Sequence, residues 1–249
     1  MPSDHPRLRG GQNPHRAYPF GEFPDDIIQG IGRQIVHRLA VGHADITGDD
    51  WGGIFAQAVS GEHLHSPVGL TDIIWNSTTS WSAKTVQAKN PFTIPLIRLI
   101  SGRCSPDYSH GISDPHADLA QTGAAVLSIW NARVDQSKND YDDLRVIILI
   151  RNMTQLEFCL FEYEPVRFSP GDYEWKVGTT ANRSNLYGYE RATGDQRFTW
   201  QFHGSQFTIH KIVPGSAAKF RIVRHPGLIE QQHVLDLIGF RPEWIVRVP

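Results

Sequence analysis

Residues 69–86 read GLTDIIWNSTTSWSAKTV, two short apolar runs joined by small polar residues. The first run, LTDIIW, contains Asp72, and the second run, WSAKTV, contains Lys84. The polar residues between them are typical of the turn of a β-hairpin. Each predicted strand therefore carries one ionisable residue at a position where a buried side chain is expected. We expect these strands at about 69–75 and 80–86.

The segments on either side of the hairpin have the periodicity of helices and buried strands. Apolar residues recur at helical spacing in three segments, and two apolar runs near the middle of the chain are typical of buried strands. The order helix, hairpin, helix, strand, strand predicts an α/β (mixed α+β) fold, with a central mixed sheet flanked by helices. The predicted helices are 25–41, a helix from 49 or 50 to 61, and 117–136; the predicted strands are 144–152 and 156–164; residues 94–102 fit either a strand or a helix.

The last third of the chain has a different composition. Residues 165–196 are polar and rich in turn formers. Phe198, Trp200 and Phe202 then alternate with polar residues as in a strand, until the sequence HGSQ at 203–206 interrupts the pattern. We therefore expect three parts: a flexible basic arm at 1–24, a core at 25–164, and a β-rich and turn-rich extension at 165–249.

Composition limits the class of protein. The chain has 249 residues, of which 40% are hydrophobic, as expected for one large domain or a core with a subdomain. The net charge of −2 gives the whole molecule no strong attraction to nucleic acid, although basic patches remain. The longest aliphatic run, 146–150, is far too short to span a bilayer. Two cysteines without a CxxC motif, and a polar start without a secretory signal, predict a cytoplasmic protein with no membrane partner.

The hairpin brings chemistry-bearing residues to one place. Side chains alternate along a strand, so Ser82 and Lys84 should share a face, and hairpin pairing would bring Asp72 close to both. Glu62 would approach from the end of the preceding helix. Asp72 and Glu62 could hold Mg²⁺, which prefers oxygen ligands and activates both water and phosphate. Lys84 could orient that water or stabilise developing charge. The alternative is a structural ion pair between Asp72 and Lys84.

This set resembles the restriction-endonuclease-like nucleases of the PD-(D/E)xK group, over roughly residues 49–150. Glu62 matches the helix acid of that group, Asp72 the central aspartate and Lys84 the lysine. Ser82 stands where Asp or Glu is expected, and Thr71 stands where proline usually precedes the aspartate. Branches of the group relocate the missing acid, and the resemblance implies that Glu62 is its substitute here.

The resemblance implies a restriction-endonuclease-like core and Mg²⁺-dependent hydrolysis of double-stranded DNA by a type II restriction enzyme, leaving 5′-phosphate ends. The implied catalytic residues are Glu62, Asp72, Ser82 and Lys84. A homodimer would suit such an enzyme, because two sites related by a two-fold axis can cut both strands of a palindrome.

Candidate DNA contacts lie outside the hairpin. Arg98 and Arg103 in RLISGRCS could neutralise phosphates. Asparagine can read adenine and arginine can read guanine through paired hydrogen bonds, so the polar stretch at about 176–210 is the predicted recognition region. The alternative is that these residues are solvated loop residues. The candidates are Asn182, Arg183, Asn185, Arg191, Gln201, His203, Ser205 and Gln206.

Two other interpretations fit the sequence. The segment 107–118 is rich in Asp and His and could bind a transition metal, which would make the chain a metallohydrolase with a different centre. Asp114 could instead be the N-cap of the following helix. Ser82 in the acid position is also compatible with a non-catalytic DNA-binding protein that keeps a degenerate nuclease core. The metal candidates in the segment are Asp107, His110, Asp114, His116 and Asp118.

Overall fold

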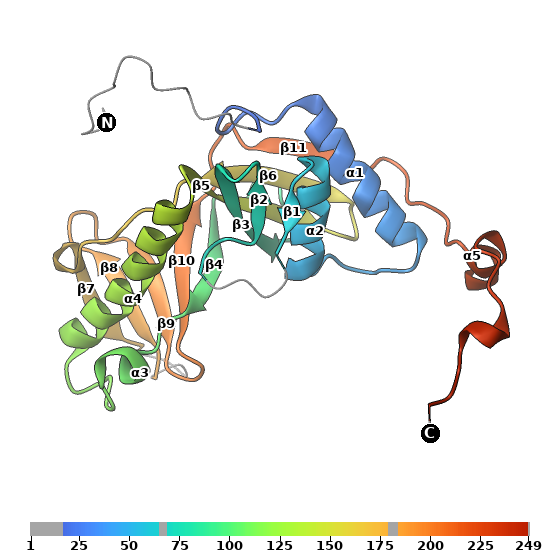
Figure 1. Cartoon of the computed structure of the whole chain (residues 1–249). Helices are drawn as coiled ribbons and strands as arrows, with labels where there is room; N and C mark the ends of the chain where they lie inside the picture. Colours follow the sequence, from blue (N-terminus) through green and yellow to red (C-terminus); the bar gives the residue numbers. More distant parts are fainter. Residues whose placement is uncertain (1–16, 65–68, 179–183, 249) are drawn as a thin grey trace, which may run out of the picture.

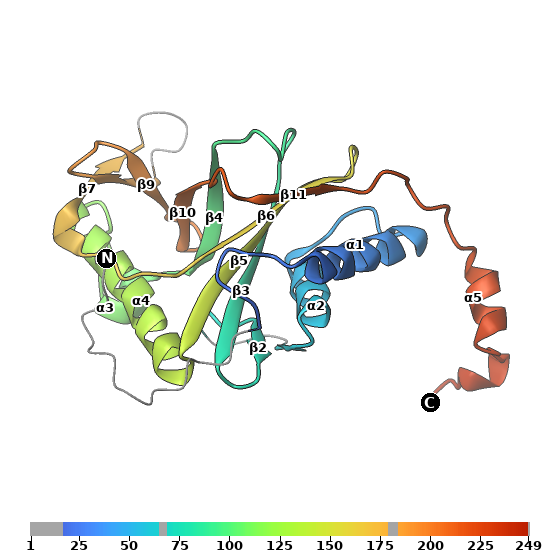
Figure 2. The same cartoon turned by 90° about the horizontal axis from the view of Figure 1, so that it is seen from above.

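The protein contains two β-sheets flanked by helices (Figure 1). This computed structural model describes residues 17–64, 69–178 and 184–248. Helices α1 and α2 lie on one side of the first sheet, and the second sheet lies on its other side together with α3 and α4 (Figures 1 and 2). The predicted mixed α+β class, with a mixed sheet flanked by helices, is confirmed.

The first sheet has six strands in the order β1-β2-β3-β5-β6-β11. Strands β3 and β5 are parallel, and every other pair in this sheet is antiparallel. A parallel pair needs a long crossover connection; here the crossover contains both β4 and α4. The strands are β1 (Glu62–His63), β2 (Ile73–Trp75), β3 (Thr79–Gln87), β5 (Asp143–Asn152), β6 (Glu157–Tyr163) and β11 (Ala218–Arg221).

Helices α1 (Asp25–Ala40) and α2 (Gly48–Ala58) cover one face of this sheet. Helix α1 buries Ile27, Ile31, Ile35 and Leu39, the stripe that the 3.6-residue period predicts. A capping box between Thr47 and Asp50 begins α2. Helix α2 ends at Ala58 rather than at 61, so the prediction that Glu62 follows the helix directly is wrong. The shared core contains Trp51, Phe55, Trp81, Ile147 and Leu160.

The second sheet has five antiparallel strands in the order β4-β10-β9-β8-β7. Residues 94–102, which fitted either a strand or a helix, contribute β4. Helix α4 (Leu119–Asp140) packs Val126, Leu127 and Trp130 against aromatic residues of this sheet. The strands are β4 (Leu96–Arg103), β7 (Tyr173–Val177), β8 (Leu186–Glu190), β9 (Gln196–Gln201) and β10 (Gln206–Ile212).

Strand β4 joins the two sheets. Its buried residues Ile97 and Leu99 pack against Val146, Ile148 and Phe161 of the first sheet. Strand β4 comes from the range 25–164 but belongs to the second sheet, whereas β11 comes from the range 165–249 and pairs with β6 in the first sheet. Each sheet therefore contains one or more strands from the other predicted part of the chain.

A buried ion network fixes the start of the described chain. Arg145, which is fully buried, donates to Asp143 and Glu162, and Tyr18 donates to Glu162 at 2.9 Å. The amide of Gly21 donates to the same carboxylate at 2.7 Å. Burial raises the pKa of Glu162, although the Arg145 charge opposes this shift. Residues 17–21, which fall within the flexible basic segment predicted at 1–24, are thus held on the sheet. Residues 1–16 lie outside the described residues.

The last elements extend away from this body. After β11 the chain continues to helix α5 (Gln231–Leu237), which stands apart from both sheets in Figures 1 and 2. Across the described ranges, no helix has the length and apolar character needed to cross a membrane. The remaining short helices are α3 (Pro106–His110) and two 3-10 turns, Pro170–Asp172 and Pro242–Trp244.

Candidate active site

Asp72 lies just before β2 and is held between two strands by its main chain. Its amide donates to the carbonyl of Trp81 on β3 at 2.8 Å, and its carbonyl accepts from Leu64, next to β1, at 2.8 Å. These bonds fix the backbone on both sides, so the side chain leaves the sheet in a defined direction.

The carboxylate of Asp72 receives three donors on one oxygen. Oδ2 accepts from the amide of Ala83 at 2.7 Å, from Ser82 Oγ at 3.1 Å and from Lys84 Nζ at 3.4 Å. Strand β2 is too short to pair with Ala83, and the carboxylate satisfies this otherwise open backbone donor. The second oxygen, Oδ1, accepts none of these three bonds.

Lys84 borders a cleft at the open edge of β3. Trp81 faces the core under α1 and α2, and the alternation of the strand turns Ser82 and Lys84 to the opposite face, toward β4. A cleft of about 420 Å³ lies between β3 and β4, lined by Lys84, Thr85, Gln87, Arg98 and Ile100 among others. Its described lining contains two cations and no acid, which suits an anionic ligand.

Glu62 reaches the site region from a strand. In β1 it lies opposite Ile74, which is two residues beyond Asp72, so Glu62 and Asp72 share a face of the sheet. Such diagonal neighbours are typically about 7–8 Å apart. The Glu62 side chain is exposed. Burial raises the pKa of Tyr141, and the carboxylates of Asp140 and Glu62 raise it further, which places Glu62 near the end of α4.

The donor set fits a metal that needs few protein ligands. Mg²⁺ is commonly bound by one or two carboxylates and several waters, and Asp72 Oδ1 with Glu62 could provide that number. Ser82 adds no independent ligand, because its hydroxyl donates to Asp72. In the part of the chain that the structure describes, no three or more His, Cys, Asp or Glu side chains are grouped to hold an ion. Among the described residues, a metal site built from three or four such side chains therefore does not fit.

The Asp- and His-rich segment 107–118 uses its polar residues locally. Asp118 is the N-cap of α4 and accepts from the amide of Gln121 at 2.9 Å. Asp114, the N-cap expected from the sequence, instead accepts from the amide of His116 at 3.0 Å. Asp107 and His110 lie in α3. The absence of a metal-ligand group among the described residues applies here too, so the structure provides no support for a separate metal centre in this segment.

Most of the predicted DNA contacts gather at one end of the second sheet. Gln206 is the cross-strand partner of both Arg103 and Gln201. Asn185 directly precedes β8, whose Leu186 pairs with Trp200, next to Gln201. His203 and Ser205 lie in the turn between β9 and β10. These residues form what we call the hairpin end: Arg103, Asn185, Gln201, His203, Ser205 and Gln206.

The other candidates lie elsewhere. Arg191 follows β8 at the opposite end of the sheet, where its Nε donates to the carbonyl of Gly171 at 3.1 Å. Arg98 is in the middle of β4 and lines the cleft beside Lys84. Asn182 and Arg183 lie outside the described residues.

Sequence reasoning missed two features of the site. The amide of Ala83 is the closest donor to Asp72, but a backbone group has no residue-type signal. The sharing of one cleft by Lys84 and Arg98 depends on how β4 packs against β3.

Comparison with models of known protein families, with curated proteins and with solved structures finds no match to this chain.

Proposed function

We propose that this protein is a Mg²⁺-dependent endonuclease that hydrolyses phosphodiester bonds in double-stranded DNA, in the manner of a type II restriction enzyme. The observation that carries the proposal is the Asp72 carboxylate, held by Ala83 and Ser82 and adjoining Lys84, which lines a cationic cleft. A structural ion pair would not require the lysine to border such a cleft.

The residues of the site have separate roles in this proposal. Ala83 and Ser82 fix Asp72 so that Oδ1 can bind the metal, with Glu62 as the second carboxylate. Mg²⁺, when bound, would polarise the phosphate and lower the pKa of a coordinated water. The Lys84 ammonium, within hydrogen-bonding range of Asp72, is placed to orient the attacking water or to stabilise negative charge that develops on the phosphate. Arg98 would neutralise a phosphate in the same cleft.

The connectivity supports the same assignment. A helix (α2), the strand β1 that carries Glu62, the strand β2 that Asp72 directly precedes, the strand β3 that carries Lys84 and a later helix (α4) follow one another in the chain. Glu62 lies on a strand rather than on the helix that the resemblance implies. Ser82 in the acid position also supports the second candidate, a DNA-binding protein without catalysis. The experiment must therefore separate binding from cleavage.

The decisive variant is Asp72→Asn. The asparagine can still accept a hydrogen bond from Ala83, but it lacks the charge that a divalent cation requires. We expect supercoiled plasmid to be cut by wild-type protein in Mg²⁺ and not in EDTA. In the variant, cutting should fall by roughly 10²–10³-fold, the usual cost of removing one preorganised electrostatic group, while binding of a DNA duplex persists.

Asp50→Asn is the matched control. Asp50 pairs with Arg38, and the exposed fractions of these two side chains, 17% and 27%, resemble the 23% and 29% of Asp72 and Lys84. Breaking this pair perturbs the fold in a similar way but leaves the candidate site intact, so cutting should persist. Near wild-type cutting by Asp72→Asn would refute the assignment. DNA binding without any Mg²⁺-dependent cutting by wild type would favour the non-catalytic candidate.

A further inference from the structure

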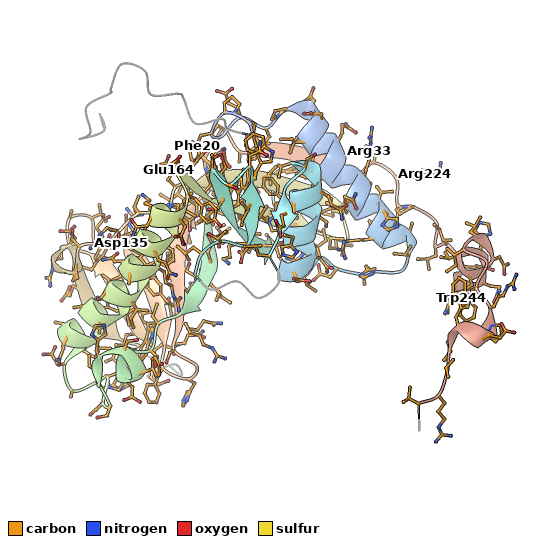
Figure 3. All side chains as sticks on the ribbon, in the orientation of Figure 1. Phe20, Arg33, Asp135, Glu164, Arg224 and Trp244 are labelled. Carbon is orange, nitrogen blue, oxygen red and sulfur yellow. The ribbon has the colours of Figure 1, made fainter. Side chains whose placement is uncertain are left out.

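The chain leaves the body of the molecule after β11. The amide of Ile222 still donates to the carbonyl of Leu156 at 3.0 Å, and its side chain packs on the core that contains Trp51, Phe55 and Trp81. Residues 223–248, which we call the arm, then extend outward (Figures 1 and 2). A hydrogen bond from the amide of Ile229 to the carbonyl of Ala40 links the arm to the end of α1 at 2.8 Å. Figure 3 shows Trp244 far from both sheets.

The arm carries an unusual share of the exposed apolar surface. Nine of the seventeen exposed large hydrophobic side chains in the described part of the chain belong to these 26 residues. No residue from 223 to 248 is buried. A concentration of exposed apolar side chains in one segment favours a contact with another molecule. The nine are Val223, Leu228, Ile229, Leu237, Ile238, Trp244, Ile245, Val246 and Val248.

The helix in the arm also needs a covering surface. Helix α5 has seven residues and buries none of them. Isolated helices shorter than about 12–15 residues are marginal in water, and most helical stability in proteins comes from packing an apolar face. Disordered linkers have few aliphatic and aromatic residues, whereas this segment is rich in both. A docked arm explains its composition better than a flexible linker does.

The charge of the arm argues against nucleic acid or a membrane surface as its partner. Arg224, Arg241 and Arg247 are balanced by Glu230, Asp236 and Glu243, so the arm has no net charge with neutral histidines. A partner with a strong negative field would select a basic segment. The surface that covers the arm should therefore be apolar and close to neutral, as another protein surface can be.

We propose that the arm docks on a second copy of this chain, and that two copies exchange arms around a two-fold axis. Each copy then supplies one arm and one acceptor surface, and the assembly closes at the dimer. A specific interface uses about 20–30 residues a side, which is the size of the arm. The sequence Pro226-Gly227 interrupts the chain between β11 and α5 and provides a connection of the kind across which elements are exchanged.

The test is the mass of the full chain in solution without DNA, measured by sedimentation equilibrium over a dilution series. We expect twice the 28.1 kDa of one chain. The double variant Leu237→Asp with Ile245→Asp places charges in the arm and should have the mass of one chain. Because neither residue is buried in the body, its circular dichroism should remain that of a folded protein.

Tyr108→Asp is the control, because Tyr108 is 92% exposed and lies outside the arm; this variant should remain a dimer. A wild-type mass of one chain at every concentration would overturn the proposal, and so would a double variant that remains dimeric. The measurement involves neither DNA nor Mg²⁺, so its outcome is independent of the proposed nuclease activity.

Discussion

Ser82 is the residue that most changes the chemistry of the candidate site. It is 1% exposed, and its hydroxyl donates to Asp72. An acid at this position would place a second carboxylate beside that of Asp72, where a metal would have to compensate the repulsion. The serine instead helps to fix the first carboxylate. If a metal binds here, the second carboxylate must come from another strand, and Glu62 on β1 shares the face.

Glu62→Gln tests that division of roles. The amide keeps the size of the side chain but removes its charge, so the Mg²⁺ concentration for half-maximal cutting should rise by about 10-fold or more, as seen when metal sites lose a supporting group. The measurement is plasmid cutting over a Mg²⁺ titration. Asp140→Asn is the control, since Asp140 is the other carboxylate that acts on Tyr141. An unchanged Mg²⁺ titration in Glu62→Gln would show that another residue is the ligand.

At the scale of elements, Arg151 fastens the loop between α1 and α2 to β5. Its Nε and Nη2 each donate to Asp45 at 2.7 Å. The hydrogen bonds from Arg151 hold the pKa of Asp45 below its usual value, against the opposing effect of desolvation. The folded state therefore favours the ionised form. This stabilisation is complete above the ordinary Asp pKa of about 3.9 and is lost as the pH falls through the lower folded-state pKa.

Asp45→Asn should therefore lower the melting temperature at neutral pH, and only slightly, because the Asp45 side chain is half exposed. The difference from wild type should shrink as the pH is lowered toward 3 and the wild-type carboxylate becomes protonated. Thermal unfolding at a series of pH values measures it. A difference that grows at acid pH would contradict the sign of the pKa shift.

The hairpin end is the element that we expect to read DNA sequence. Gln206 can form paired hydrogen bonds with adenine, and losing such a pair costs about 1–3 kcal/mol of discrimination. Gln206→Ala should weaken binding to the cognate duplex more than to a scrambled one, once a selection from random duplexes has identified the cognate site. Arg191→Ala, at the other end of the sheet, is the comparison. Equal losses on both duplexes for Gln206→Ala would place recognition elsewhere.

The sequence predicted the elements whose signal is local. The period of α1, the buried run of β5 and the alternation that places Ser82 and Lys84 on one face are all properties of adjacent residues. Its errors concern boundaries and partners. Helix α2 ends before 61 because the chain turns into β1, and nothing in the residues 94–102 indicates that β4 pairs with β10. Such pairings depend on residues distant in sequence, so single-sequence periodicity cannot reveal them.

At the scale of the whole molecule, the proposed exchange of arms would connect assembly to the proposed reaction. A dimer presents two candidate sites to one duplex and can cut both strands in a single encounter. We expect wild-type protein to convert supercoiled plasmid to the linear form. The double variant Leu237→Asp with Ile245→Asp should accumulate nicked circles first, as seen on agarose gels over time. Linear product without a nicked intermediate from that variant would show that cutting of both strands does not need the arm.

The pairing of β4 with β10 has a consequence for how the protein is made. Arg103 pairs with Gln206, so β4 leaves the ribosome long before the strand that completes its edge. Until then the backbone edge that will pair with β10 is open to other chains, the condition in which strands aggregate. Nascent chains therefore pass through an extended interval in which one sheet is half built. Slow translation between 104 and 205 would lengthen that interval and would be expected to lower the recovery of folded protein.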